Sequence, residues 1–188
     1  LLRNTSHVYN SCGTYTARLV ATSQNNCKDT VFKNVNVFCK PDADFSAPDV
    51  CLNFLTAFSD SSTVQNSNIV SWKWNFADGI GISSQKNPGY LYKSDGKFNV
   101  GLIVVSANGC RDTVIKTVTI YPLPLADFSI SNVCLNFTSK FSDLTSIKSG
   151  NISKWNWNFN DNIIDSVQDP YHLYASSGTY NPQLIVTS

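Results

Sequence analysis

Hydrophobic and polar residues alternate in short runs along the chain. Residues 72–76 and 98–104 carry an apolar side chain at every second position, and Phe54, Thr56 and Phe58 alternate with their neighbours in the same way. Because successive side chains of a β-strand point to opposite faces, each run predicts a strand with one buried face. Asn, Asp, Ser, Gly and Pro separate such runs, and no segment has the period of an amphipathic helix. The pattern is typical of an all-β sandwich or barrel.

The pattern repeats along the chain. The motif Ala-Asp-Phe-Ser at 43–46 returns at 126–129, a spacing of 83 residues from Ala43 to Ala126. The motif Val-Cys-Leu-Asn-Phe at 50–54 returns with the same spacing, at 133–137. An earlier copy precedes these two, since Tyr9 to Cys27 match Tyr92 to Cys110. A fixed spacing of this size predicts a tandem array of small domains.

Three parts are expected from this repeat. Residues 1–42 form the C-terminal half of a first repeat, 43–125 a complete repeat, and 126–188 a third repeat that lacks its last strand. Proline-containing linkers at 39–42 and 121–124 separate them. Because proline removes a backbone donor and restricts φ, these linkers predict stiff joints between neighbouring repeats of the chain.

Each complete repeat is predicted to be two sheets packed face to face, with seven to nine strands and no helix longer than one turn. The residues expected to line the core of the second repeat are Trp74, Phe76, Phe98, Leu102 and Val104. Trp157 and Phe159 take the equivalent places in the third repeat. Pro182 lacks an N–H in a strand that should be central, so we expect a break in the ladder there.

Two hairpin turns are expected from asparagine pairs. Asn108-Gly109 is a strong signal for a two-residue type I′ turn, in which both central residues have positive φ, and Asn25-Asn26 is its equivalent in the first repeat. A two-residue turn there would place residues whose numbers add to 51 directly opposite each other, as Cys12 and Cys39 are. Directly opposed residues lie within disulfide reach, so we predict a Cys12–Cys39 bond.

The composition of the chain argues against nucleic-acid binding, membrane insertion and a metal site. Hydrophobic residues make up 42% of the chain and charged residues only 14%, with a net charge of +1 and no block of Lys or Arg. This gives no electrostatic footprint for nucleic acid, and no apolar run is long enough for membrane insertion. Six cysteines without a Cys-x-x-Cys motif indicate disulfides in an oxidising, extracellular compartment rather than a metal site.

Residues 74–79 read Trp-Asn-Phe-Ala-Asp-Gly and are followed by Asn87-Pro88, Tyr92 and Gly96. This succession resembles the polycystic-kidney-disease (PKD) domain, and residues 157–162 begin the same succession in the third repeat. The resemblance implies tandem immunoglobulin-like β-sandwiches and covers essentially the whole chain.

Two positions depart from the family's motif. Ala77 or Asn160 stands where the family has the glycine before the turn aspartate, and Asn162 replaces the motif's final glycine. Asparagine tolerates left-handed backbone geometry, so the turn is expected to survive in the third repeat.

The remaining cysteines resemble those in PKD arrays of large Bacteroidetes surface proteins, which implies type IX secretion and a role in adhesion, gliding or spacing. In an immunoglobulin-like sandwich, the cysteine of the second strand and the cysteine after the hairpin turn lie at opposite poles. We therefore predict that the second-strand cysteine of one repeat pairs with the hairpin cysteine of the next, so that Cys51 would pair near position 193. The four cysteines concerned then make no bond with one another among these residues; they are Cys27, Cys51, Cys110 and Cys134. The same resemblance implies O-glycosylation at Asp-Ser/Thr-aliphatic motifs, at Thr30, Thr113 and Ser166.

No catalytic residue and no cofactor is assigned. His172 and His7 occupy equivalent positions, but Tyr90 stands at that place in the second repeat, so a structural, hydrogen-bonded histidine is expected. The aspartate pairs have ordinary roles in turns and no nucleophile nearby; they are Asp60 with Asp78 and Asp143 with Asp161.

Two binding alternatives remain open. Turn Asp and Asn residues could supply calcium ligands, although no EF-hand spacing occurs. Trp72 and Trp155 are expected at the core margin, with a carbohydrate-binding shelf as the alternative.

The leading hypothesis is a non-enzymatic spacer or adhesive stalk of a secreted or cell-surface protein, without reactive clusters. The alternative is an accessory module of an exported hydrolase that binds polysaccharide or protein. An exposed, coplanar strip of aromatic side chains would favour the alternative.

Overall fold

A computed structural model describes residues 4–188, and in that range it contains β-strands and no helix. The all-β class expected from the alternating pattern is confirmed. The chain divides into two compact units. The first comprises the residues up to Pro48 with Leu55–Leu91 and Lys97–Val118, and the second comprises Asp49–Phe54, Tyr92–Gly96 and Thr119–Ser188.

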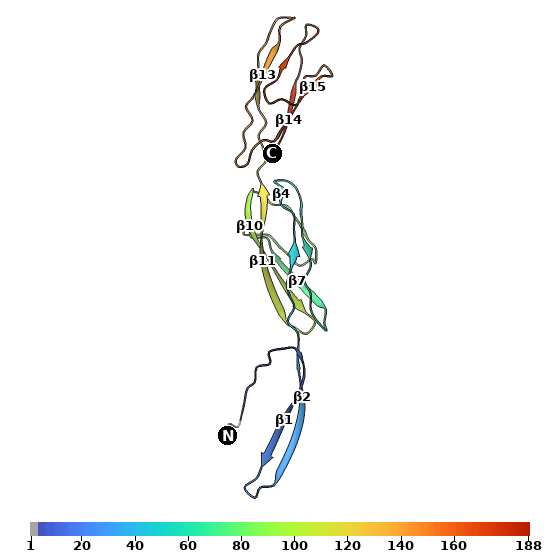
Figure 1. Cartoon of the computed structure of the whole chain (residues 1–188), viewed down its shortest axis with the longest axis vertical. Coiled ribbons are helices and arrows are strands. Elements are labelled where there is room, and N and C mark those ends of the chain that lie inside the picture. Colours follow the sequence, from blue (N-terminus) through green and yellow to red (C-terminus); the bar gives the residue numbers. More distant parts are fainter. Residues whose placement is uncertain (1–3) are drawn as a thin grey trace. The chain divides into compact units, whose positions relative to one another are not determined.

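The first repeat is represented by one long antiparallel hairpin, β1 (Gly13–Thr22) with β2 (Lys28–Val37) (Figure 1). Most of its side chains are exposed, including the apolar Leu19 and Phe32. Ten residue pairs join the strands, from Gly13 opposite Val37 to Thr22 opposite Lys28. The hairpin therefore has a full hydrogen-bonded ladder but little core of its own.

The turn of this hairpin differs from the expected one. Asn26 N donates to Ser23 O at 3.0 Å and Ser23 N donates to Cys27 O at 2.9 Å, while Asn26 has φ 62°. This is a three-residue loop that ends in a left-handed residue, a common hairpin connection. Paired residue numbers therefore add to 50, and the expected register was wrong by one position.

The Cys12–Cys39 disulfide is nevertheless present, with the two Cα atoms 4.9 Å apart. Both cysteines lie just beyond the last ladder pair, Gly13 with Val37. Neighbouring strands remain close there, so a diagonal pair still falls within the range that a disulfide can bridge. The predicted bond is confirmed, although the register from which it was predicted is not.

The second repeat contains nine strands, within the predicted seven to nine. They are β3 (Phe45–Ser46), β4 (Val50–Cys51), β5 (Thr56–Ala57), β6 (Ser59–Asp60), β7 (Ile69–Asn75), β8 (Ile82–Ser83), β9 (Gly89–Tyr90), β10 (Gly96–Ser106) and β11 (Arg111–Tyr121). One sheet has the order β4-β11-β10-β7-β8, and β3-β6 and β5-β9 form two short ladders. The β4–β11 pair is parallel.

The hairpin between β10 and β11 uses the same loop as the first repeat. Gly109 N donates to Ser106 O at 2.9 Å, and Ser106 N donates to Cys110 O at 2.8 Å. Gly109 has φ 80°, but Asn108 is not among the residues with positive φ. The expected type I′ turn is therefore wrong, because three loop residues share the reversal and only the last needs the left-handed conformation.

The core prediction for the second repeat holds with one exception. Trp74 is fully buried, and so are Phe76, Leu102 and Val104 to within about one per cent of their surface. Phe98, near the start of β10, is only half-buried. Val100, two residues further along the same face of the strand, is fully buried.

The third repeat contains six strands in the part of the chain that the structure describes. They are β12 (Phe128–Ile130), β13 (Ser139–Asp143), β14 (Lys154–Asn158), β15 (Ile164–Asp165), β16 (Tyr171–His172) and β17 (Gln183–Thr187). They form two sheets, β12-β13-β16 and β15-β14-β17. The core cluster contains Phe141, Trp157, Phe159 and Leu184, so the expected burial of Trp157 and Phe159 is confirmed.

Pro182 lies directly before β17, and residues 178–182 form no strand. The equivalent residues of the second repeat, 96–100, belong to β10, the neighbour of β11 in the sheet. The interruption predicted at Pro182 is therefore present, and the missing N–H of proline is its physical reason.

We predict that the disulfide stabilises the β1–β2 hairpin, because the hairpin has little apolar core to hold it otherwise. Replacing Cys12 and Cys39 by Ser should reduce protection of the β1 and β2 amides from hydrogen exchange by a free energy of about 3 kcal/mol, the value typical for closing a loop of this size. Exchange in β10 and β11 should not change. Cys27→Ser is the matched control, and equal protection in all three proteins would contradict the prediction.

Candidate functional site

The aspartate in the turn after the tryptophan strand joins separate segments of the second repeat. Asp78 Oδ1 accepts hydrogen bonds from the backbone N–H of Gly81 at 2.7 Å and of Ile80 at 3.2 Å. Asp78 Oδ2 accepts a hydrogen bond from the Tyr90 hydroxyl. The Tyr90 ring stacks on Phe76 with 4.0 Å between the ring centroids. One carboxylate thus closes its own turn and fixes β9 beside it.

The third repeat builds the same arrangement with a histidine. His172 Nε2 lies 2.7 Å from Asp161 Oδ2, and the imidazole stacks on Phe159 with 4.1 Å between the ring centroids. His172 is buried. Tyrosine and histidine are interchangeable here because each offers a flat ring to the phenylalanine and a polar edge to the carboxylate. The structural role expected for His172 agrees with this geometry; His7 instead contacts Tyr9 edge-to-face.

A second aspartate in each repeat binds the outer tryptophan. The Trp72 indole N–H donates to Asp60 Oδ2 at 2.8 Å, and the Trp155 indole N–H donates to Asp143 Oδ2 at 2.7 Å. The two aspartates of each pair therefore have different partners, and neither pair shares a site for a reacting group. This supports the turn role expected for the aspartates over general acid–base catalysis.

Hydrogen bonds shift the pKa values of Asp78, Tyr90 and Asp143. Burial alone would raise the pKa of Asp78, but the Tyr90 hydroxyl and the backbone N–H of Gly81 and Ile80 outweigh it and lower the pKa. The same hydrogen bond raises the pKa of Tyr90 to about 12. Burial of Asp143 is likewise outweighed by hydrogen-bond donors, and its pKa is lowered. Ionised acceptors facing neutral donors suit structural hydrogen bonds, since catalytic acids and bases need pKa values near the working pH.

The inner tryptophans belong to the core. The indole N–H of Trp74 donates to Gln85 O at 2.8 Å, and that of Trp157 donates to Val167 O at 2.8 Å. Trp72 is half-buried, and the Lys86 Nζ lies 5.8 Å from the centroid of its ring. A small groove of about 390 Å³ lies beside Trp72. The tryptophans therefore do not form a free aromatic strip in the described repeats.

The four repeated cysteines are free thiols in the structure. Cys51 lies opposite Tyr121 at the last position of β11, whereas Cys110 directly precedes the first. The length of one strand, on the order of 33 Å for ten residues, separates the two positions along the chain. This arrangement agrees with the expected placement at opposite poles. Disulfides between neighbouring repeats through Cys27, Cys51, Cys110 and Cys134 stay a prediction.

Two further expectations also stay predictions. Thr30, Thr113 and Ser166 are exposed, as O-glycosylation requires, but their modification is untested. Among residues 4–188 there is no group of three or more His, Cys, Asp or Glu side chains that could hold a metal ion. Calcium binding through turn Asp and Asn oxygens stays a prediction.

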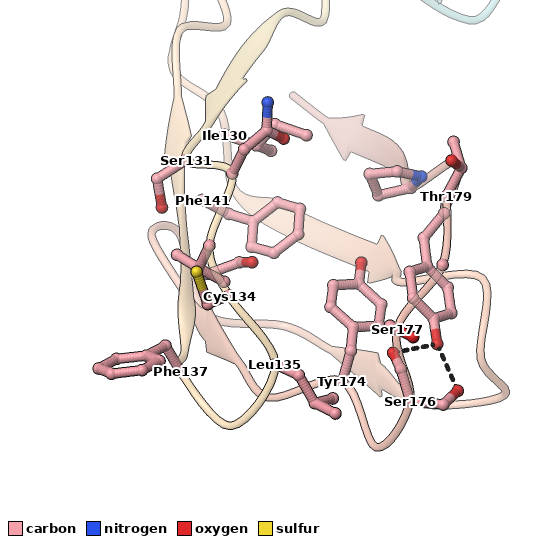
Figure 2. Close-up of a pocket in the computed structure, with 16 residues that line it drawn as sticks. Ile130, Ser131, Cys134, Leu135, Phe137, Phe141, Tyr174, Ser176, Ser177 and Thr179 are labelled. Atoms are coloured by element: carbon pink, nitrogen blue, oxygen red, sulfur yellow. Dashed lines mark hydrogen bonds between the residues drawn. The ribbon is translucent and has the colours of Figure 1, made fainter.

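A larger groove, of about 720 Å³, lies in the third repeat (Figure 2). Figure 2 shows Cys134 on one side, Thr179 on the other, and the rings of Phe141 and Tyr174 between them. Tyr180 stacks on Tyr174 at 3.9 Å and its hydroxyl donates to Ser176 O at 3.0 Å. The sequence analysis missed this groove. Val133 and Cys134, which line it, belong to a repeated motif, but nothing in the spacing of that motif indicates a groove.

The fold and these contacts define a class of protein, that of tandem immunoglobulin-like β-sandwich repeats. A family model described as the PKD domain matches residues 39–120 and 123–188. The chain therefore belongs to the PKD domain family. No helix within the described residues is long and apolar enough to cross a membrane.

Parts of much longer proteins resemble this chain. A microbial collagenase of Vibrio alginolyticus is 39% identical over 69 residues, which cover 37% of this chain and 8% of the collagenase. Collagenase ColQ1 of Bacillus cereus (strain Q1) is 32% identical over 101 residues, 49% of this chain and 10% of that protein. The chain spans about a tenth or less of these curated relatives. The crystal structure of the PKD1 domain of Vibrio anguillarum Epp has 26% sequence identity and a TM-score of 0.41, covering 43% of this chain and 93% of that one.

These relatives come from Vibrio and Bacillus. Membership of the PKD domain family is thus established, whereas the resemblance to Bacteroidetes surface proteins stays a prediction. The same holds for type IX secretion and gliding motility, which depended on that resemblance.

We predict that Ala77→Gly stabilises the second repeat. Ala77 has φ 62° at a position where only glycine is unstrained, and left-handed geometry costs a residue with a Cβ about 1 to 2 kcal/mol. After allowing for the greater entropy of glycine in the unfolded chain, we expect a gain of about 1 kcal/mol in the free energy of unfolding, measured with urea. The control is Asn160→Gly, which should gain less because asparagine tolerates φ 64°. A loss of stability in Ala77→Gly would contradict the prediction.

We also predict that acid destabilises the repeats. The folded-state pKa values of Asp78 and Asp143 are lowered, so both carboxylates stabilise the fold above the unfolded value of about 3.9, and this contribution is lost as the pH falls below it. The thermal midpoint should therefore fall between pH 5 and pH 3. Asp143→Asn should unfold at a lower temperature at pH 6 and show a smaller fall on acidification. If the thermal midpoint of Asp143→Asn fell with pH as much as that of the parent, Asp143 would not contribute to the loss of stability in acid.

Proposed function

We propose that the chain is a non-enzymatic, extracellular PKD repeat module that spaces or joins other parts of a larger exported protein. The observation that carries this proposal is its similarity to a small part of two collagenases, 8% and 10% of their lengths. A module of that size leaves most of such a protein for catalysis elsewhere. The carboxylates and the histidine that could have suggested chemistry here are bound to structural partners.

The burial and hydrogen bonding of the tryptophan side chains favour a spacer over a ligand-binding module. Trp74 and Trp157 are buried, and both Trp72 and Trp155 are only half-exposed with their indole N–H groups bonded to aspartates. Proline-containing linkers add stiffness between repeats. These features support a spacer or stalk, including one that carries an adhesive part of a cell-surface protein.

A second candidate is an accessory module that binds a protein or polysaccharide ligand for an exported hydrolase. The groove beside Trp72 is the observation that favours it, since a half-exposed indole flanked by polar groups suits contact with a sugar or a peptide. The names of the two curated relatives point to collagen as the first protein ligand to examine.

Co-sedimentation of the chain with insoluble collagen, cellulose and chitin separates the two candidates. For a spacer we expect no retention above that of serum albumin on any of the three. Retention that is lost in Trp72→Ala, while Tyr121→Ala binds as the parent does, would overturn the spacer and establish the binding module. Tyr121 is a suitable control because it is an exposed aromatic residue away from that groove.

A further inference from the structure

The segments that lead into the second and third repeats are held by the same pair of backbone hydrogen bonds. Asp42 and Thr63 exchange two such bonds, of 2.8 and 3.0 Å, and Leu125 and Ser146 do the same. Thr63 and Ser146 are equivalent at the 83-residue spacing, as are Asp42 and Leu125. The loop that contains Thr63 or Ser146 therefore lies beside the linker in both repeats.

In the third repeat this loop carries a lysine that contacts the preceding repeat. Lys148 Nζ lies 2.9 Å from Asp95 Oδ2 and 3.1 Å from Asp95 Oδ1, so one ammonium group bonds both carboxylate oxygens. Asp95 directly precedes β10 of the second repeat, and both residues belong to the second compact unit. The Asp95 side chain is only 21% exposed, and the hydrogen bond from Lys148 lowers the pKa of its carboxyl group. The joint between the second and third repeats thus contains an ion pair.

The joint between the first and second repeats brings the same two repeat positions together with different side chains. Cys12 stands where Asp95 stands, and Gln65 stands where Lys148 stands. Cys12 is bonded to Cys39, whose Sγ lies 4.0 Å from Gln65 Oε1. Cys12, Cys39 and Gln65 all belong to the first compact unit. The residue that precedes the long hairpin of one repeat is therefore linked, directly or through Cys39, to the same loop residue of the next repeat at both joints.

We propose that these two repeat positions form the joint between consecutive repeats of the array, and that their side chains determine how firmly each joint is held. Asp95 and Lys148 make the second joint ionic. At the first joint the equivalent of Asp95 is tied covalently to the linker, and an uncharged amide lies next to the disulfide. Rising salt is therefore expected to loosen the second joint and to leave the first unchanged, because salt screens the attraction between charges.

The ion pair acts on the arrangement of two segments rather than on the stability of either repeat. Lys148 is 72% exposed, and an exposed ion pair adds little to the free energy of unfolding because water screens it and both side chains lose freedom. The two residues are nevertheless 53 positions apart in the chain and belong to different repeats. The contact would exist equally in a spacer and in a ligand-binding module, so it can be tested independently of the proposed function.

Zero-length cross-linking with a water-soluble carbodiimide tests the second joint directly. The carbodiimide takes up one oxygen of the Asp95 carboxylate and leaves as a urea, while the Lys148 amine loses a proton and forms an amide with the carboxyl carbon. We expect this product in the monomeric chain at low ionic strength, detected by mass spectrometry after digestion. The internal control is the product between Lys116 and Asp44, which lie 2.6 Å apart within the first compact unit.

Salt and charge reversal then test whether the pair holds the joint. Raising the salt from about 0.01 M to about 1 M shortens the Debye length from about 30 Å to about 3 Å, so the yield of the Asp95–Lys148 product should fall about threefold or more. The rotational correlation time of the third repeat, from amide nitrogen relaxation, should shorten in Lys148→Glu because like charges then face each other. The double variant Asp95→Lys with Lys148→Glu should restore it. Lys154→Glu, an exposed lysine of the same repeat, is the matched control and should behave as the parent does.

Transferring the second joint to the first tests whether the positions are equivalent. In a chain with Cys12→Asp, Cys39→Pro and Gln65→Lys, the same reagent should couple positions 12 and 65. The matched control carries Thr63→Lys in place of Gln65→Lys, which places the amine two residues away on the same loop. It should give less product with position 12.

Three results would overturn the proposal. The first is absence of the Asp95–Lys148 product in a sample that forms the Lys116–Asp44 product. The second is a third-repeat correlation time in Lys148→Glu equal to that of the parent. The third is a transferred joint that gives no more product than its control. Hydrogen-exchange protection of β10, β13 and β14 in each variant verifies that the repeats remain folded.

Discussion

The buried tryptophan at the centre of each sandwich is the constraint on which the other contacts depend. Trp74 packs against Phe45 and Phe58 with ring centroids 5.1 and 5.4 Å away, and Trp157 packs against Phe128 and Phe141 at the same two distances. A buried indole also needs an acceptor for its N–H, because an unpaired buried donor costs about 1 to 3 kcal/mol. The carbonyls of Gln85 and Val167 supply it. The core therefore fixes the position of a loop as well as of the sheets.

Side-chain hydrogen bonds supplement the very short strands around this core. β3, β5, β6 and β9 have two residues each, so their ladders contribute few backbone bonds. Aspartates in the adjoining turns bind the neighbouring strands: Asp60 holds Trp72, and Asp78 holds Tyr90. Because the carboxylate can accept from a hydroxyl or an imidazole, Tyr90 in one repeat and His172 in the next preserve the same packing. His172, which could suggest catalysis in the sequence, therefore has the same packing role as Tyr90.

Side-chain contacts also hold the last strand of the second repeat. Asp112 and Lys116 fasten β11 to the opposite segment, while Val118 and Ile120 complete the core.

The sequence by itself determined the all-β class, the 83-residue repeat, the burial of Trp74, Phe76, Trp157 and Phe159, and the Cys12–Cys39 bond. These follow from alternation and spacing that can be read directly along the chain, and the disulfide tolerated a register error of one because the two strands stay close beyond their last ladder pair. Tertiary structure decided the rest. It decided that the hairpins turn through three residues, that Phe98 is only half-buried, that Asp60 and Asp78 bind different rings, and that a groove opens beside Cys134. The hairpin loops depend on the backbone conformation of three residues, and the other features depend on which segments pack together. Packing between distant residues leaves no period in the sequence from which it could be read.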